Sequence, residues 1–359
     1  MPEPMHGLFL HCRAGFESEC AAEIQTRAAA LDVAGWCRTK PAAAYVVFVV
    51  PQAADAERLQ RELSFATLIF ARQWFRIVAL VNDLDIQDRV RGLVAALADD
   101  VPTACGLFLE TPDTNAAKEL QPLCRKLDRP LRAALQGAGH LSDAPGAWTE
   151  RLHVCLLATV AAYVGVAPIA NSSPHPMGIP RLRFPKGAPS RSTLKLEEAL
   201  LTFLDAQERA ALLRPGMRAV DLGAAPGGWT WQLVRRGLRV TAVDNGALAP
   251  ALLDSGLVEH RREDGFRFRP GEPVDWMVCD IVEQPARVAE LAARWLGEGW
   301  CRYAVFNLKL PMKKRYQEVE ECLARVRARL EATGRPFRLA CKQLYHDREE
   351  VTVFAASGA

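Results

Sequence analysis

The nine residues Asp221–Trp229 read Asp-Leu-Gly-Ala-Ala-Pro-Gly-Gly-Trp and constrain the fold more than any other segment of the 359-residue chain. They follow a short apolar run at 218–220 and precede a helical pattern at 231–234, so they predict a strand, a tight turn and a helix start. Glycines in the turn allow positive φ and close approach of a ligand to the main chain. N–H groups at the helix start favour an anionic group. The segment therefore predicts a ligand-binding turn of an α/β fold.

The spacing of the glycines excludes two common nucleotide-binding loops. The dinucleotide pattern G-x-G-x-x-G is absent because two alanines follow Gly223, and the P-loop is absent because Trp-Thr follows Gly228. A turn that binds no ligand stays open as an alternative. Asp244 ends the next apolar run, 239–243, where a nucleotide-type α/β fold places the carboxylate that takes ribose hydroxyls.

From residue 194 onward, helical segments alternate with short apolar runs. We expect strands at 218–222, 239–243, 274–279, 303–308, 337–344 and 350–355, with helices between them. This alternation predicts a Rossmann-like, doubly wound α/β domain over 191–359.

The first half of the chain has a different pattern, which predicts an α+β region. In residues 1–74 we expect a ferredoxin-like unit, with strands at 8–12, 45–50 and 68–75 and helices at 17–30 and 55–63. In residues 75–168 we expect a second α+β unit, with helices at 85–98 and 118–136 and a strand at 105–110. Basic residues on the 118–136 helix make either a solvated face or an RNA-contacting face.

Two further segments of the front half affect the domain organisation. Residues 154–170 are uncharged but are shorter than a membrane span, so we expect a buried strand pair and no membrane partner. Residues 169–190 are rich in Pro, Ser and Gly and predict the linker to the α/β domain.

Charge is unevenly distributed along the chain. The net charge is +3, but residues 1–168 carry 16 Lys and Arg against 19 Asp and Glu, whereas residues 169–359 carry 29 against 23. The second half is therefore the better candidate for binding a polyanion. The ten cysteines are scattered without C-x-x-C pairs, which predicts reduced thiols in a cytoplasmic protein and no metal site.

Four ionisable residues occupy positions near the edge of the predicted sheet where a doubly wound fold binds its ligands. Lys195 enters the first helix of the domain, and Asp280 and Lys309 stand at strand ends. Glu350 opens the last strand, although Glu349 beside it leaves this position ambiguous. A lysine can accept a hydroxyl proton if burial or nearby positive charge depresses its pKa, and carboxylates can hold it in place. A charged residue at a strand end is also commonly just solvated.

Together these four residues resemble the Lys-Asp-Lys-Glu set of FtsJ-like 2′-O-methyltransferases, and the Ala-Pro-Gly-Gly-Trp turn resembles the S-adenosylmethionine loop of that branch. Longer segments resemble the bacterial RlmM family, namely 12–17, 69–75, 189–199, 306–316 and 343–353. The resemblance covers nearly the whole chain. It implies methyl transfer from S-adenosyl-L-methionine to the 2′-hydroxyl of a cytidine in 23S rRNA or a large-subunit precursor. It also implies a catalytic lysine as proton acceptor and a THUMP-containing RNA-binding region at 75–168, in a monomer.

The same resemblance implies a set of cofactor contacts. They are Ser192, Gly223, Ala225, Pro226, Gly227, Gly228, Asp244, Asp264 and Asp280. Asp244 would accept from the ribose hydroxyls and Asp264 would lie near the adenine amino group, although Glu-Asp-Gly is also an ordinary turn. Basic residues within 180–195 and 313–315 could neutralise RNA phosphates or simply solvate a loop.

Several other functions were weighed against this one. An NAD-linked oxidoreductase is disfavoured by the missing G-x-G-x-x-G, and a base amino-methyltransferase by Ile-Val-Glu after Asp280. A carbon-5 pyrimidine methyltransferase needs a nucleophilic cysteine, but Cys279 points to the opposite strand face from Asp280. A 2′-O-methyltransferase of another RNA and a non-catalytic RNA-binding protein stay open.

Overall fold

The structure is a computed structural model that describes residues 5–97, 101–142, 144 and 148–358. It divides into two compact units, Met1–Pro180 and Arg181–Ala359, and each contains a seven-stranded sheet. The division falls within residues 169–190, the segment for which the sequence predicts a linker.

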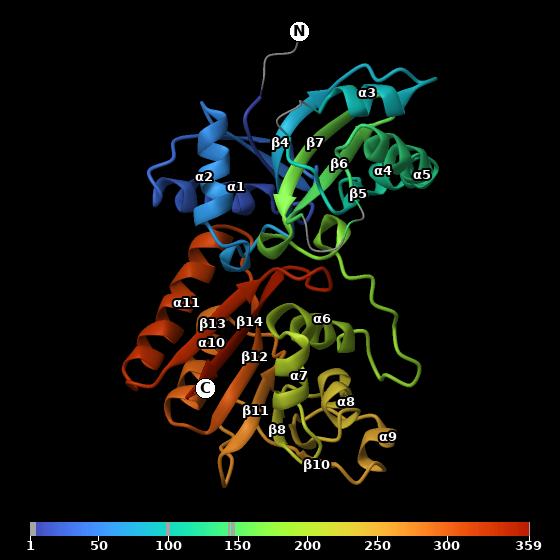
Figure 1. The fold of residues 1–359 in the computed structure, drawn as a ribbon. Coiled ribbons are helices and arrows are strands. Elements are labelled where there is room, and N and C mark those ends of the chain that lie inside the picture. Colours follow the sequence, from blue (N-terminus) through green and yellow to red (C-terminus); the bar gives the residue numbers. More distant parts are fainter. Residues whose placement is uncertain (1–4, 98–100, 143, 145–147, 359) are drawn as a thin grey trace. The chain divides into compact units, whose positions relative to one another are not determined.

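The first unit begins with an antiparallel sheet in the order β2-β3-β1-β4. Its elements are β1 (Gly7–His11), α1 (Glu17–Ala29), β2 (Trp36–Thr39), β3 (Tyr45–Val49), α2 (Ala53–Glu62), η1 (Phe65–Thr67) and β4 (Gln73–Val81). The helices α1 and α2 lie beside these strands (Figure 1). This order and alternation are those of a ferredoxin-like fold.

The same sheet continues through the strands β7, β6 and β5. The further elements of the unit are α3 (Arg89–Ala95), β5 (Leu107–Glu110), α4 (Asn115–Lys118), α5 (Gln121–Gly137), β6 (Glu150–Ala158), β7 (Ala161–Pro168), η2 (Ile169–Asn171) and η3 (Pro176–Gly178). Strand β4 pairs with β1 on one side and with β7 on the other, so one sheet runs through the expected boundary at residue 74.

Several expected elements of this unit differ from the structure. The helix expected at 85–98 begins only at Arg89, after its N-cap Asp88, and the strand expected at 105–110 begins at Leu107. The strand expected at 68–75 begins only at Gln73, because the backbone N–H groups of Ile69 and Phe70 donate to the buried carboxylate of Glu23, at 2.5 and 2.9 Å, instead of to a neighbouring strand. The helix expected at 118–136 is interrupted after Lys118, and α5 then begins with Pro122 in its first turn.

The second unit contains a sheet in the order β10-β9-β8-β11-β12-β14-β13, parallel except for β14. Its elements are α6 (Thr193–Phe203), α7 (Ala206–Leu212), β8 (Arg218–Leu222), α8 (Gly228–Val234), β9 (Arg239–Val243), α9 (Pro250–Leu253), β10 (Val258–Arg261), β11 (Val274–Cys279), α10 (Pro285–Gly297), β12 (Cys301–Lys309), α11 (Arg315–Glu331), β13 (Phe337–Lys342) and β14 (Glu350–Ser357). The expected doubly wound α/β class is confirmed. Helices α10 and α11 lie on one side of the sheet, and α6, α7 and α8 on the other (Figure 1).

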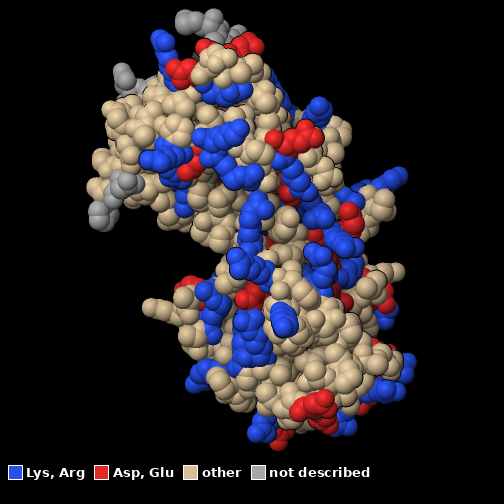
Figure 2. All heavy atoms as spheres, turned by 90° about the vertical axis from the view of Figure 1, so that its right-hand side faces the viewer, with Lys and Arg blue, Asp and Glu red and all other residues tan. Residues whose placement is uncertain are grey.

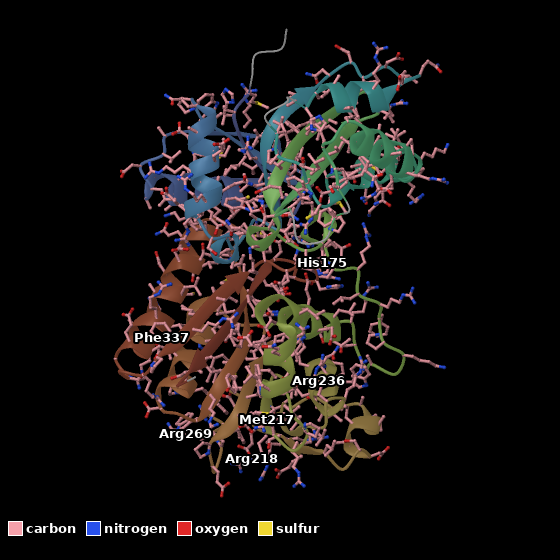
Figure 3. The ribbon with its side chains drawn as sticks, viewed as in Figure 1. His175, Met217, Arg218, Arg236, Arg269 and Phe337 are labelled. Atoms are coloured by element: carbon pink, nitrogen blue, oxygen red, sulfur yellow. The ribbon has the colours of Figure 1, made fainter. Side chains whose placement is uncertain are left out.

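The carboxyl ends of the parallel strands define one edge of this sheet, where open α/β sheets bind ligands. Arg218 and Phe337, labelled in Figure 3, begin β8 and β13 and therefore mark the opposite edge. Arg236, also labelled there, lies in the turn after α8 and donates to Glu197 of α6 at 2.6 Å. Among the helices of the described residues, none is long and apolar enough to cross a membrane.

Candidate active site

Four elements of the second unit bring ionisable side chains to the carboxyl edge of its sheet. Lys195 lies in the first turn of α6, and Asp280 follows directly after β11. Lys309 ends β12 and is the cross-strand partner of Glu350, the first residue of β14. Because β14 runs antiparallel to β12, the beginning of β14 meets the end of β12 at this edge.

The structure brings these four side chains into direct contact. The Nζ atom of Lys195 is 3.1 Å from Asp280 Oδ2 and 2.6 Å from Glu350 Oε1. Lys309 Nζ is 2.5 Å from Asp280 Oδ1 and also donates to Glu350 Oε2. Each lysine therefore contacts both carboxylates, and the two positive and two negative charges balance. Glu349 instead pairs with Arg315 at 2.6 Å, outside this cluster.

Contacts within the cluster shift the pKa values of Asp280 and Lys309. Burial opposes ionisation of Asp280, yet the charges of Lys309 and Lys195 outweigh it and hold its pKa below the usual range. Burial also favours the neutral amine of Lys309, but Asp280 and Glu350 outweigh it and raise the pKa of Lys309. A depressed pKa is the condition under which a lysine can act as a base, and the two carboxylates within hydrogen-bond distance of Lys309 oppose it.

A buried polar layer under the four side chains was missed by sequence reasoning. Asn307 Nδ2 donates to Asp280 Oδ1 at 3.0 Å and to Glu350 Oε2 at 3.4 Å. Thr352 Oγ1 lies 2.8 Å from Asn307 Oδ1 and 3.0 Å from the carboxylate of Asp347. The signal was present in the sequence, because Asn307 precedes Lys309 by two residues and Thr352 follows Glu350 by two. Residues two apart share a strand face.

The glycine turn packs tightly against the segment that leads into α6. A Cβ atom added to Gly228 would lie 2.1 Å from Ser192 Oγ and 2.4 Å from Ser190 Oγ. Trp229 Nε1 donates to the Ser192 carbonyl oxygen at 3.0 Å. Gly223 and Gly227 have φ of +78° and +113°, which glycine adopts without strain. The expected cofactor residues Ser192, Gly223, Gly227 and Gly228 thus lie together, along with Ala225 and Pro226 of the same turn.

Asp244 follows β9 and faces this turn. Its Oδ2 accepts from the Ala225 N–H at 2.9 Å and its Oδ1 accepts from the Gly246 N–H at 2.7 Å. A carboxylate offers about four acceptor positions, so two backbone bonds leave capacity for the two hydroxyls of a ribose. The glycine turn and Asp244 therefore form a site that suits an adenosine-type ligand.

Two other acids have different surroundings. Asp264 is half-exposed, and its Oδ1 accepts from the Phe266 N–H at 2.8 Å, which is the turn geometry that Glu-Asp-Gly also allows. Asp221 is buried at the end of β8, where it accepts from Thr230 Oγ1 at 2.6 Å. Burial raises the pKa of Asp221 to about 7, although the bond from Thr230 opposes this.

The fold and this site define a class of protein, and sequence comparison agrees with it. The family described as FtsJ-like methyltransferase matches residues 188–313. The RlmM ferredoxin-like domain matches residues 5–75, and the family described as Ribosomal RNA large subunit methyltransferase M, N-terminal, matches residues 88–168.

Full-length relatives narrow the class further. The chain is 55% identical over 347 residues to the Ribosomal RNA large subunit methyltransferase M of Methylococcus capsulatus, covering 97% of each chain. It is 54% identical over 348 residues to the proteins of that name from Pseudomonas aeruginosa and Cellvibrio japonicus, covering 97% of this chain and 98% of each relative. The chain therefore belongs to the family of ribosomal RNA large subunit methyltransferase M, and the resemblance seen in the sequence is confirmed.

Proposed function

We propose that this chain transfers a methyl group from S-adenosyl-L-methionine to the ribose 2′-hydroxyl of a cytidine in 23S rRNA or a large-subunit precursor, with Lys309 as the proton acceptor. Membership of the family of rRNA large subunit methyltransferases supports the methyl transfer and the RNA class. The single observation that carries the choice of a hydroxyl acceptor is the contact of Lys195 and Lys309 with the same two carboxylates at the ligand edge of the sheet.

The glycine turn and Asp244 are the residues that would hold the cofactor. A Cβ at Gly228 would clash with two serine hydroxyls, and one at Gly246 would come within 2.8 Å of the Ala225 side chain, so the backbone there leaves room only for glycine. We assign ribose recognition to Asp244 and keep contact of Asp264 with the adenine as a prediction. When bound, the cofactor supplies an activated methyl group and a sulfonium charge, which favours the neutral form of an adjacent amine.

The residues of the chain would then take up the proton that the 2′-hydroxyl loses. Lys309 Nζ, in its neutral form, accepts the proton of the attacking 2′-hydroxyl, and the oxygen forms its new bond to carbon as the carbon–sulfur bond breaks. Asp280 and Glu350 fix the position of this amine and stabilise it once it is charged. Lys195 contacts the same two carboxylates. Its positive charge offsets part of the negative charge that favours the charged form of Lys309. Most of the rate acceleration would come from the positioning of the hydroxyl by these preformed side chains.

We assign RNA binding to the front region and to basic segments of the second unit. Residues 75–168 would serve as the THUMP-like part, and the basic residues within 181–195 and 313–315 would contact phosphates. Figure 2 shows that Lys and Arg outnumber Asp and Glu on the visible face of the protein, which suits a polyanionic partner. We further propose that the protein works as a monomer in the cytoplasm, consistent with ten free cysteines among the described residues.

The test uses purified protein, labelled S-adenosylmethionine and unmodified 23S rRNA, followed by digestion to nucleosides and mass spectrometry. We expect label in 2′-O-methylcytidine with the wild type and with Lys40→Ala, an exposed lysine of the first unit that serves as the control. We expect Lys309→Ala to lose at least about a hundredfold in turnover while calorimetry shows unchanged cofactor affinity. Label in a base would refute the hydroxyl acceptor, and near-normal turnover of Lys309→Ala would refute the base.

A further inference from the structure

Two apolar side chains in the loops that follow Asp280 and Lys309 have no part in the proposed proton transfer or in the cofactor site. Val282 and Met312 are each 86% exposed, more than any other large hydrophobic side chain among the residues that the structure describes. Val282 follows Asp280 by two residues, and Met312 follows Lys309 by three. Single exposed apolar residues are common on proteins. A pair on the two loops that carry the reacting groups is more informative, because exposed apolar surface at a site marks what the site binds.

The loop after β11 exposes Val282 because the preceding residue, Ile281, packs against the protein. A Cβ atom added to Gly223 would lie 2.6 Å from Cγ1 of Ile281, and one added to Gly265 would lie 3.1 Å from Cδ1 of the same residue. Ile281 therefore fills the space beside the glycine turn. Val282, the next residue, is left in solvent beside the reacting carboxylate of Asp280.

The loop after β12 holds Met312 at a fixed tip. The Leu310 N–H donates to the Glu349 carbonyl oxygen at 2.8 Å, and Arg315 Nε donates to the Pro311 carbonyl oxygen at 3.1 Å. The first bond ties the loop to the residue before β14, and the second closes the segment that contains Met312 onto the start of α11. The exposure of this side chain is therefore a property of a held loop, and Lys313 directly after it is suited to a phosphate.

Chain length limits how far each tip can lie from the residues of the active site. An extended chain spans at most about 3.5 Å per residue, so the Cα of Val282 lies within about 7 Å of that of Asp280, and the Cα of Met312 within about 11 Å of that of Lys309. A ribose whose 2′-hydroxyl meets Lys309 Nζ carries its base into the same range. Proteins that act on single nucleotides in RNA commonly take the base out of the stack and hold it against apolar or aromatic side chains.

We propose that Val282 and Met312 hold the base of the target nucleotide between them, outside the RNA stack, while its ribose hydroxyl meets Lys309. This inference rests on the proposed function and adds to it the residues that position the substrate. Two apolar side chains offer contact area without hydrogen bonds, so they hold a base of any identity. Met suits this use because its unbranched side chain adapts to the surface that it meets.

The experiment compares polar and apolar replacements of similar size. Val282→Thr and Met312→Gln remove apolar character with little change of shape, whereas Val282→Ile and Met312→Leu keep it. Both positions are exposed, so we expect the same thermal midpoint for every variant. With 23S rRNA as substrate, each polar variant should raise the KM for RNA about fivefold, and the double polar variant about twentyfold. The apolar variants should keep the wild-type KM, and the dissociation constant for S-adenosylmethionine should not change in any of them.

The outcomes separate this proposal from the proposed function. A wild type that makes no 2′-O-methyl nucleoside would refute the function itself. An active wild type with an unchanged KM for RNA in the double polar variant would refute only the clamp. The clamp also fails if the apolar variants lose as much as the polar ones, or if the loss appears as weaker cofactor binding.

Discussion

Asp221 is a buried residue whose ionisation opposes folding. It is 1% exposed, and burial raises its pKa to about 7 from an unfolded value near 4. Between these two values the native state binds more protons than the unfolded state, so the contribution of this group to stability falls as pH rises through that window. Above pH 7 the cost is fully present.

We therefore expect Asp221→Asn to stabilise the protein at pH 8 by a few kcal/mol at most and to have a smaller effect at pH 4. An asparagine can still accept from Thr230 Oγ1, so the hydrogen bond need not be lost. Urea unfolding at both pH values measures the difference. Equal effects at pH 4 and pH 8 would mean that folding does not raise the pKa of Asp221.

Glu350 should control the pH at which Lys309 becomes a base. Burial lowers the pKa of Lys309, but Asp280 and Glu350 raise it by more. In Glu350→Gln one of these two carboxylates is neutral, so the pKa of Lys309 should fall. The acid limb of the rate profile should then move to lower pH, even though the maximal rate decreases.

Single-turnover rates from pH 6 to pH 10 would measure this shift. Glu349→Gln is the matched control, because Glu349 pairs with Arg315 and does not contact Lys309. An acid limb that stays in place in Glu350→Gln, or one that moves equally in the control, would contradict the role given to Glu350.

At the scale of elements, the turn between β8 and α8 carries the cofactor prediction. Gly228→Ala should weaken S-adenosylmethionine binding at least about tenfold, because the added Cβ would meet Ser192 Oγ and Ser190 Oγ and push the turn away from α6. Gly271→Ala is the control, since no atom lies within 4 Å of the Cβ that it adds. Calorimetric titration of both variants decides the point, and equal affinities would remove the turn from the cofactor site.

The elements also show which parts of the fold a sequence reveals. The strands β8, β9 and β11 have the predicted bounds because they are short apolar runs inside a parallel sheet. Strand β10 was not predicted, because Val258–Arg261 is a charged edge strand whose apolar content is low. The early strand expected at 68–75 was too long, because a distant carboxylate, Glu23, takes its backbone donors.

The candidate site was predictable to a similar degree. Positions at strand ends for Asp280, Lys309 and Glu350, at the helix start for Lys195, and the resemblance to the FtsJ-like set identified these four candidates, and the structure brings them together. The polar layer of Asn307, Thr352 and Asp347 was not found, because the bond between Asn307 and Thr352 depends on the pairing of β12 with β14 and joins residues 45 positions apart. The raised pKa of Lys309 was also out of reach, since it depends on distances between atoms.

At the scale of the whole molecule, the excess of positive charge belongs to the second half. Lys313→Glu should weaken RNA binding and make the salt dependence of the affinity shallower, by the equivalent of about one to two phosphate contacts. Arg239→Glu is the control, because Arg239 begins β9 at the opposite edge of the sheet. Filter binding at several salt concentrations gives both slopes. Equal slopes for Lys313→Glu and the wild type would leave Lys313 without a phosphate partner.

Strand β14 is an inner strand of its sheet, between β12 and β13, and it supplies Glu350. The residues at 350–357 therefore pair with two strands that both precede them in the chain. While the chain is still being translated, β12 and β13 have no partner between them and Lys309 lacks one of its two carboxylates. The cluster of Lys195, Asp280, Lys309 and Glu350 therefore forms only once β14 has inserted between β12 and β13.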